Sequence, residues 1–210
     1  MLRTSDARVC PYPPLLGASA LLSAAELAAS LDATLAERAD TDDFWVFGYG
    51  SLIWNPGLPL AESCRASVRG YHRGLYLWSR VNRGTVERPG LVLGLDRGGS
   101  CHGMALRVAA DDRRASLDAL WRREMAMGSY RPAWLPCYLA DGRRVSALAF
   151  VMRRDAAAYA GRLAPEVVQA ASSACGRYGS TLDYIVRTVE ALRAAGIRDR
   201  GLELLAGRCK

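Results

Sequence analysis

The hydrophobic positions along the chain fall into short strand-like runs and longer helix-like stretches. Runs rich in aromatic and β-branched residues, in part alternating with polar ones, predict strands over 44–47, 66–79 (as one strand or two), 91–95, 101–108, 135–139 and 143–152. Capping residues and apolar residues at helical spacing predict helices over about 22–38, 111–127, 165–174 and 180–195, and a last short helix after Gly196.

Turn signals between the strands indicate how they pair. The segment 97–100 contains two glycines and closes the strand 91–95, so that 101–108 is expected to fold back on it as a hairpin. Asp141-Gly142 is a strong hairpin signal between the last two predicted strands. Because the strands come in antiparallel pairs and do not alternate regularly with helices, we predict an α+β fold with a curled sheet or small barrel.

The first part of the chain differs from the rest. Residues 1–14 contain three prolines and are interpreted as a loose tail, and a capping-box pattern beginning at Ser23 opens an alanine-rich helix. The polar stretch 39–43 then links this helix to the larger, strand-rich part of the chain. We therefore predict an N-terminal tail and helical extension over 1–43 and one main domain over 44–210.

Composition and charge narrow the function classes. The 210 residues are 50% hydrophobic and 23% charged, which is typical of a globular chain and excludes a disordered one. The net charge is +7, but the arginines are scattered singly or in pairs, so we expect no nucleic-acid partner; an anionic small molecule fits the same charge. No apolar run is long enough to cross a membrane, so no membrane partner is expected.

The cysteines and histidines argue against disulfides and metal. Six cysteines are present without a Cys-x-x-Cys spacing, which favours free thiols in a reducing cytoplasm. With only two histidines, a structural zinc or other metal site is not expected.

A glycine-rich segment follows the first predicted strand. Gly48-Tyr49-Gly50-Ser51-Leu52 can turn successive backbone N–H groups into one concavity, which suits a carboxylate or an oxyanion. Ile53 stands where a dinucleotide-binding fingerprint needs a third glycine, so that motif is absent. A plain turn flanked by buried aromatic residues is the alternative interpretation.

Glu124 is the most informative single residue. It lies at helical spacing from Leu117, Leu120 and Trp121, so its carboxyl shares an apolar helix face. Loss of water there raises the pKa of a glutamate above its ordinary value of about 4.3, which suits proton transfer near neutral pH. The alternative is a glutamate at the rim that pairs with an arginine such as Arg123 or Arg131.

A few further side chains are candidates for binding a substrate. Arg80 and Arg83 flank a short loop and could clamp a carboxylate, although arginines in such loops are often simply solvated. Tyr130 and Tyr184 are candidate hydroxyl donors, and the alternative places them at the edge of the core.

The motifs taken together resemble the ChaC-like, glutathione-specific γ-glutamylcyclotransferases. The resemblance begins at Trp45-Val-Phe-Gly-Tyr-Gly-Ser-Leu-Ile-Trp54 and continues through Arg83-Gly84-Thr85, Arg88-Pro89-Gly90, Trp121-x-Arg123-Glu124-Met125, Tyr130-Arg131-Pro132 and Gly176-x-x-Gly179-x-x-x-Asp183-Tyr184. These motifs occur in order over about 44–190, which is far more specific than any one of them.

The resemblance implies a small, mostly antiparallel β-barrel with flanking helices. It implies an enzyme, a lyase, that converts glutathione to 5-oxoproline and cysteinylglycine with no cofactor. The family's catalytic glutamate matches Glu124. Substrate-binding residues are then expected at Phe47, Gly48, Tyr49, Gly50, Ser51, Leu52, Arg80, Tyr130 and Tyr184.

The sequence departs from the family pattern in three places. Val81-Asn82, Val86 and Thr181 replace residues common in the family, which bears on substrate selectivity more than on reaction type. Three alternatives therefore stay open: a cyclotransferase for γ-glutamyl amino acids or γ-glutamylamines, a basic nucleic-acid-binding module, and a catalytically silent scaffold. The sequence predicts no oligomeric state.

Overall fold

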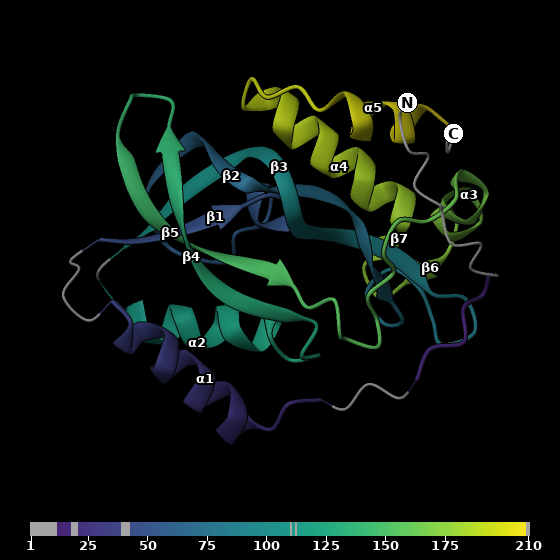
Figure 1. Ribbon diagram of the computed structural model, residues 1–210, viewed down its shortest axis with the longest axis horizontal. Coiled ribbons are helices and arrows are strands. Elements are labelled where there is room, and N and C mark those ends of the chain that lie inside the picture. Colours follow the sequence, from purple (N-terminus) through teal and green to yellow (C-terminus); the bar gives the residue numbers. More distant parts are fainter. Residues whose placement is uncertain (1–11, 18–20, 39–42, 110, 112, 209–210) are drawn as a thin grey trace, which may run out of the picture.

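Five strands close into a barrel, and helices pack on two sides of it (Figure 1). The computed structural model describes residues 12–17, 21–38, 43–109, 111 and 113–208. The barrel strands are β1 (Phe44–Gly48), β2 (Leu60–Ser79), β3 (Gly90–Val108), β4 (Tyr130–Leu139) and β5 (Arg144–Met152). The other elements are α1 (Ala24–Ala36), the 3₁₀ turn η1 (Ser51–Ile53), α2 (Arg113–Glu124), α3 (Pro165–Ser172), β6 (Cys175–Gly176), β7 (Gly179–Ser180), α4 (Thr181–Ala194) and α5 (Arg200–Arg208).

The barrel has the strand order β1-β3-β2-β4-β5. All neighbouring pairs in that order are antiparallel, and a short parallel pairing of β1 with β5, at Trp45 with Ala147 and Val46 with Leu148, closes it. The predicted α+β class and the small, mostly antiparallel barrel are therefore confirmed.

The predicted hairpin turn at 97–100 is wrong. β3 runs without interruption through this segment and pairs with β2 on both sides of it. Gly98 and Gly99 have φ of 107° and 69°, and Gly70 on the facing part of β2 has φ of 81°. A register shift there lets both strands bend together, so the glycines mark a bulge in one long ladder.

The hairpin at Asp141-Gly142 is confirmed, with Gly142 at φ 91°. Its first strand, β4, starts at Tyr130, ahead of the predicted start at Leu135. The small hairpin β6–β7 and the turn η1 were not predicted.

The helices cover the barrel in two groups, with α1 and α2 together on one side and α4 and α5 on another (Figure 1). Ser23 caps α1 in the predicted capping box, and α2 ends at Glu124, earlier than predicted. The predicted loose tail and interdomain linker lie largely outside the described residues. Within the described residues, no helix combines the length and apolarity needed to cross a membrane.

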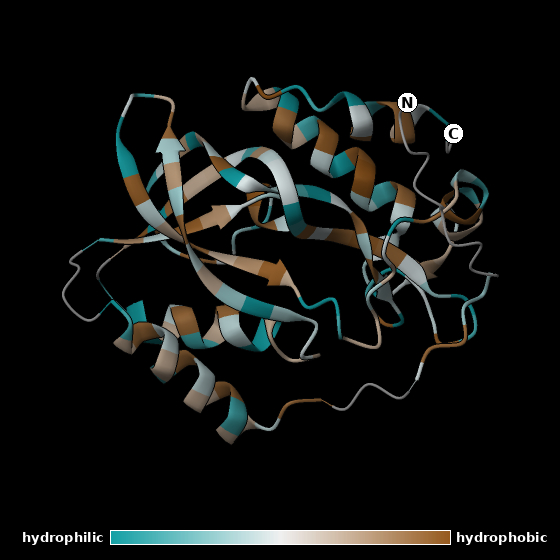
Figure 2. Ribbon diagram, viewed as in Figure 1, coloured by the Kyte–Doolittle hydropathy of each residue, from teal (hydrophilic) through white to brown (hydrophobic). Residues whose placement is uncertain are grey.

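Two hydrophobic clusters form the core. One fills the barrel and the space beneath α3, α4 and α5, and the other lies between the barrel and the pair α1–α2. Figure 2 shows hydrophobic positions along the strands and along α4. Leu117, Leu120 and Trp121 are at most 2% exposed, so the apolar face predicted for α2 is confirmed.

Thr181 joins α4 to the barrel and gives a stability prediction. Its fully buried hydroxyl accepts a hydrogen bond of 2.7 Å from the amide of Leu91. We expect Thr181→Val to lower the free energy of unfolding by about 1–3 kcal/mol, because it leaves a buried N–H without an acceptor. Thr85→Val is the matched control, since water can replace the hydroxyl of the exposed Thr85. Urea unfolding of both variants checks this, and equal losses would contradict it.

Candidate active site

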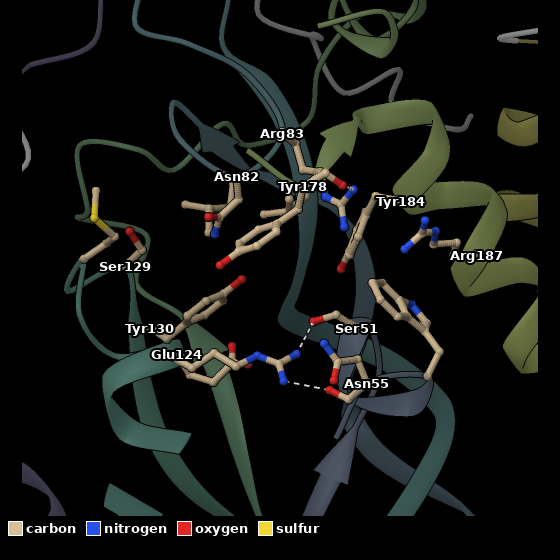
Figure 3. A pocket seen from close by; sticks show the side chains of 15 residues that line it. Ser51, Asn55, Asn82, Arg83, Glu124, Ser129, Tyr130, Tyr178, Tyr184 and Arg187 are labelled. Atoms are coloured by element: carbon tan, nitrogen blue, oxygen red, sulfur yellow. Dashed lines mark hydrogen bonds and ion pairs between the residues drawn. The ribbon is translucent and has the colours of Figure 1, made fainter. Parts of the chain in front are cut away.

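Two adjoining cavities open where the turn after β1 meets α2, β4 and α4 (Figure 3). The outer cavity has a volume of about 580 Å³, and the inner one is a small recess of about 30 Å³. Both are lined by Ser51, Glu124, Tyr130 and Tyr184, so these side chains stand at the junction. The structure therefore brings together predicted site residues from four distant parts of the sequence.

The glycine-rich segment turns sharply after β1 and forms one wall of the inner recess. Within η1 the amide of Ile53 donates to the carbonyl of Gly50 at 3.0 Å. The amides of Ser51 and Leu52 come before this first bond and have no acceptor inside the turn. Tyr49, Gly50, Ser51 and Leu52 line the recess, as expected of a group of anion-binding amides.

Phe47 and Gly48 are placed differently from the rest of the segment. Both are buried in β1, and neither lines the two cavities. They support the turn from inside the barrel wall, so direct substrate contact by either stays a prediction.

Gly50 lies in close contact with the side chain of Tyr184. A Cβ atom added at Gly50 would lie 2.6 Å from the hydroxyl oxygen of Tyr184. This distance is well inside van der Waals contact, so any other residue at position 50 forces the turn or the buried Tyr184 side chain to shift. The sequence motif thus reflects a steric need at this position.

Glu124 is the last residue of α2, and its carboxyl lies between the two cavities. The side chain is 15% exposed. Burial raises the pKa of the Glu124 carboxyl above its ordinary value, and the Arg123 guanidinium, with Nε 3.1 Å from Oε1, opposes this rise. The structure therefore combines the two predicted environments: the carboxyl is largely desolvated, and it also pairs with Arg123.

Arg123 connects Glu124 to the glycine-rich turn. Its two terminal nitrogens donate to the hydroxyl of Ser51 at 2.9 Å and to the carbonyl of Asn55 at 2.7 Å. The guanidinium fork thereby holds the end of α2 against η1. The sequence indicated Arg123 only as an ion-pair partner, and this second function was missed.

Three buried tyrosines surround the recess. Tyr49 donates to the carbonyl of Phe150 at 2.7 Å, and Tyr130 donates to the carbonyl of Leu93 at 3.0 Å. Burial is the main reason that the pKa of each of these two phenols lies well above its ordinary value, and it raises the pKa of Tyr184 to about 12. All three therefore remain neutral hydroxyl groups near neutral pH.

The loop after β2 contributes a different arginine from the one expected to bind substrate. Arg80 does not line either cavity, whereas Arg83 lines the outer one and is 5% exposed. The guanidinium of Arg83 donates to the carbonyl of Tyr178 and lies 5.1 Å from the ring centre of Tyr184. The sequence does mark Arg83, because this residue begins the Arg83-Gly84-Thr85 motif.

Tyr178 and Arg187 also line the outer cavity and were missed. Arg187 follows Tyr184 by three positions on α4, so helical spacing alone places the two on one face. Tyr178 sits in the tip of the β6–β7 hairpin, and no periodic pattern marks it.

The arrangement favours proton transfer on an anionic small molecule. A desolvated carboxyl stands beside backbone amides and neutral phenols, while Arg83, Arg123 and Arg187 make the surroundings positive. The recess accepts only a small group, and the outer cavity is large enough for a further part of the same molecule.

Comparisons with known proteins agree with this chemistry. The family described as "ChaC-like protein" matches residues 44–209. A relative from Escherichia coli (strain K12), named glutathione-specific gamma-glutamylcyclotransferase, is 40% identical over 185 residues, covering 88% of this chain and 80% of that protein. The mouse protein named glutathione-specific gamma-glutamylcyclotransferase 1 is 32% identical over 173 residues, covering 79% and 78%.

The fold is shared with solved structures. A yeast gamma-glutamyl cyclotransferase specific to glutathione superposes with a TM-score of 0.73 at 18% identity, covering 80% of this chain and 96% of that one. At this identity the likeness establishes the fold and carries no residue-level assignment.

Proposed function

This chain belongs to the ChaC-like family, and from that premise we propose that it is a γ-glutamylcyclotransferase that cleaves glutathione into 5-oxoproline and cysteinylglycine. The observation that carries the proposal is the buried Glu124 carboxyl beside the amides of the glycine-rich turn. No protein nucleophile, metal or cofactor is needed for this reaction, because the attacking amine belongs to the substrate.

The substrate closes a ring on itself. The α-amine of its γ-glutamyl group attacks the γ-carbonyl, a C–N bond forms in a five-membered ring, and the original amide C–N bond breaks. The amine starts as an ammonium and loses two protons, one before attack and one as the ring closes, and the departing nitrogen of cysteinylglycine gains two and leaves as an ammonium. Holding the chain bent for this attack supplies up to roughly 7–11 kcal/mol of the barrier reduction.

Glu124 moves the proton in both directions. An α-amine titrates near ~8 and is largely protonated at neutral pH, so a base must accept its proton before attack. A carboxyl whose pKa is raised by burial is a better base than an exposed one, and once protonated it is the acid for the leaving nitrogen. One side chain thus serves in both steps.

The inner recess is where we place the γ-glutamyl group. The amides of Ser51 and Leu52 bind its α-carboxylate, and the neutral hydroxyls of Tyr130 and Tyr184 line the space beside it. The remainder of the substrate extends into the outer cavity. The described cysteines are free thiols, which suits a reducing compartment such as the cytoplasm.

Release of 5-oxoproline tests the proposal. We expect the purified chain to release it from glutathione and to release little from γ-glutamyl-alanine at equal concentration. Preferred turnover of γ-glutamyl-alanine or of a γ-glutamylamine would keep the reaction type and replace the substrate. No 5-oxoproline from any of the three would reject the proposed function.

Arg123 gives a prediction about pH dependence. Its positive charge lowers the pKa of Glu124, so Arg123→Gln raises that pKa and moves the acid limb of the kcat/KM profile to higher pH. Loss of the fork to Ser51 also loosens the turn, and we expect kcat/KM to fall by roughly 10- to 100-fold at neutral pH. Full pH–rate profiles measure both effects.

The control is Arg122→Gln, which removes an exposed charge from the neighbouring position of α2. We expect its profile to match that of the parent chain. An acid limb that stays in place in Arg123→Gln, with the fold intact, would contradict the assigned electrostatic effect.

A further inference from the structure

The outer cavity holds two arginines that form no ion pair with the described residues. Arg83 and Arg187 both line it, yet the ion pairs found in the described part of the chain all involve other arginines. Arg187 lies with its guanidinium 5.7 Å from the ring centre of Trp54. Two positive groups thus line one cavity without a paired carboxylate from the described residues.

Burial makes this arrangement unfavourable at Arg83. Burial, followed by the charge of Arg187, lowers the pKa of the Arg83 guanidinium, while Tyr184 and Asp183 act in the opposite direction. The Asp183 carboxylate caps the start of α4 by accepting from the amide of Ser180 at 2.9 Å, and it offsets part of the two positive charges without forming an ion pair with either arginine. Burial of a cation without a paired counter-ion is costly, so an anionic ligand is favoured next to Arg83.

The Arg83 guanidinium also has donors left for a ligand. Its hydrogen bond to the carbonyl of Tyr178 uses one of five donors. Arg83 lines the outer cavity, so its remaining donors are available to a ligand there. Figure 3 shows Arg83 reaching into the cavity between Tyr178 and Tyr184.

The two arginines face the part of the cavity away from the reacting centre. In Figure 3 Glu124 lies at the opposite side of the cavity from Arg83. If the proposed function holds, the γ-glutamyl group fills the recess next to Glu124, and the departing dipeptide extends toward Arg83 and Arg187. That dipeptide carries one carboxylate, at its glycine end.

Resting on the proposed function, we propose that Arg83, with Arg187 beside it, binds the glycine carboxylate of the substrate and so selects γ-glutamyl tripeptides, whose terminal carboxylate reaches these arginines. The planar fork of Arg83 suits a two-point contact with this group. γ-Glutamylamines lack the carboxylate and leave both arginines without an anion, so they are poor substrates for this chain.

The experiment compares glutathione with its glycinamide, in which the glycine carboxylate is an uncharged amide. Release of 5-oxoproline gives kcat/KM for each, and the ratio of the two is the selectivity. We expect the parent chain to prefer glutathione by about 10- to 100-fold, as for a charge-assisted hydrogen bond. In Arg83→Gln the ratio falls toward one, through slower turnover of glutathione and not through faster turnover of the amide.

Two further variants separate recognition from folding. Arg83→Lys keeps the charge but loses the planar fork, and we expect it to give an intermediate selectivity ratio. Arg187→Gln is expected to lower the ratio less than Arg83→Gln does. Arg88→Gln, an exposed position in the same loop, is the control and retains the parental ratio.

Each outcome supports or rejects the inference. Equal kcat/KM of the parent chain for glutathione and its glycinamide would reject the inference but not the proposed cyclotransferase function. This comparison uses the parent chain alone, so it does not depend on any variant being folded. A parental ratio in both Arg83→Gln and Arg187→Gln would also overturn it. Absence of 5-oxoproline from glutathione would reject the proposed function, and the inference with it.

Discussion

Replacing Glu124 by glutamine is expected to lower kcat for 5-oxoproline release by at least about 100-fold, the lower end of what general acid–base catalysis contributes. The amide has the shape of the carboxyl, but it neither accepts the proton of the substrate amine nor donates one to the departing nitrogen. KM is expected to change little, because the amides of the turn and the arginines of the outer cavity still bind the substrate.

Steady-state kinetics with glutathione measure this effect, with thermal unfolding to show that the variant is folded. Glu190→Gln, which alters an exposed glutamate on α4, is the matched control and retains the parental kcat. A folded Glu124→Gln that turns over at the parental rate would remove the carboxyl from the chemistry, and with it the proposed mechanism.

Gly50→Val is expected to abolish substrate binding in the recess. The new side chain begins at a Cβ that would lie 2.6 Å from the Tyr184 hydroxyl, so either the turn or the Tyr184 side chain must move. A displacement of about 1 Å at a reacting centre lowers rates by about 100-fold, and we expect a loss of at least that size in kcat/KM. Unchanged KM and kcat would show that the turn is not part of the site.

A double replacement tests whether the steric contact is the cause. Gly50→Ala introduces only the Cβ, and Tyr184→Phe removes the oxygen that it meets. If the contact is responsible, the double variant is more active than Gly50→Ala alone, although Tyr184→Phe by itself does not raise activity. A double variant whose loss of activity equals the sum of the two single losses would contradict this explanation.

Local patterns predicted those parts of the molecule that local physics determines. The helical spacing of Leu117, Leu120, Trp121 and Glu124 correctly predicts three buried apolar side chains and a largely desolvated carboxyl, because a helix face depends on its own sequence. The pair Gly98-Gly99 was misread as a turn. Glycines at positive φ serve a bulge as well as a turn, and only the facing strand decides between them.

The outer cavity depends on contacts between distant segments and was predicted less well. The amide of Arg177 donates to the carbonyl of Val81 at 2.8 Å, and that of Tyr178 donates to the carbonyl of Asn82 at 3.0 Å. These bonds seat the β6–β7 hairpin on the loop after β2 and place Tyr178 next to Arg83. No pattern within either segment reveals a partner so far away in the sequence, so Arg80 could not be distinguished from Arg83 without tertiary information.

The closure of the barrel completes one wall of the inner recess. β1 pairs with β5 far along the chain, and the Tyr49 hydroxyl, at the start of the glycine-rich turn, bonds to the carbonyl of Phe150 in that last barrel strand. During synthesis β1 emerges early and waits for β5, with one of its edges unpaired. A chain that lacks β5 therefore carries an exposed strand edge prone to association, and its inner recess lacks the wall to which Phe150 contributes.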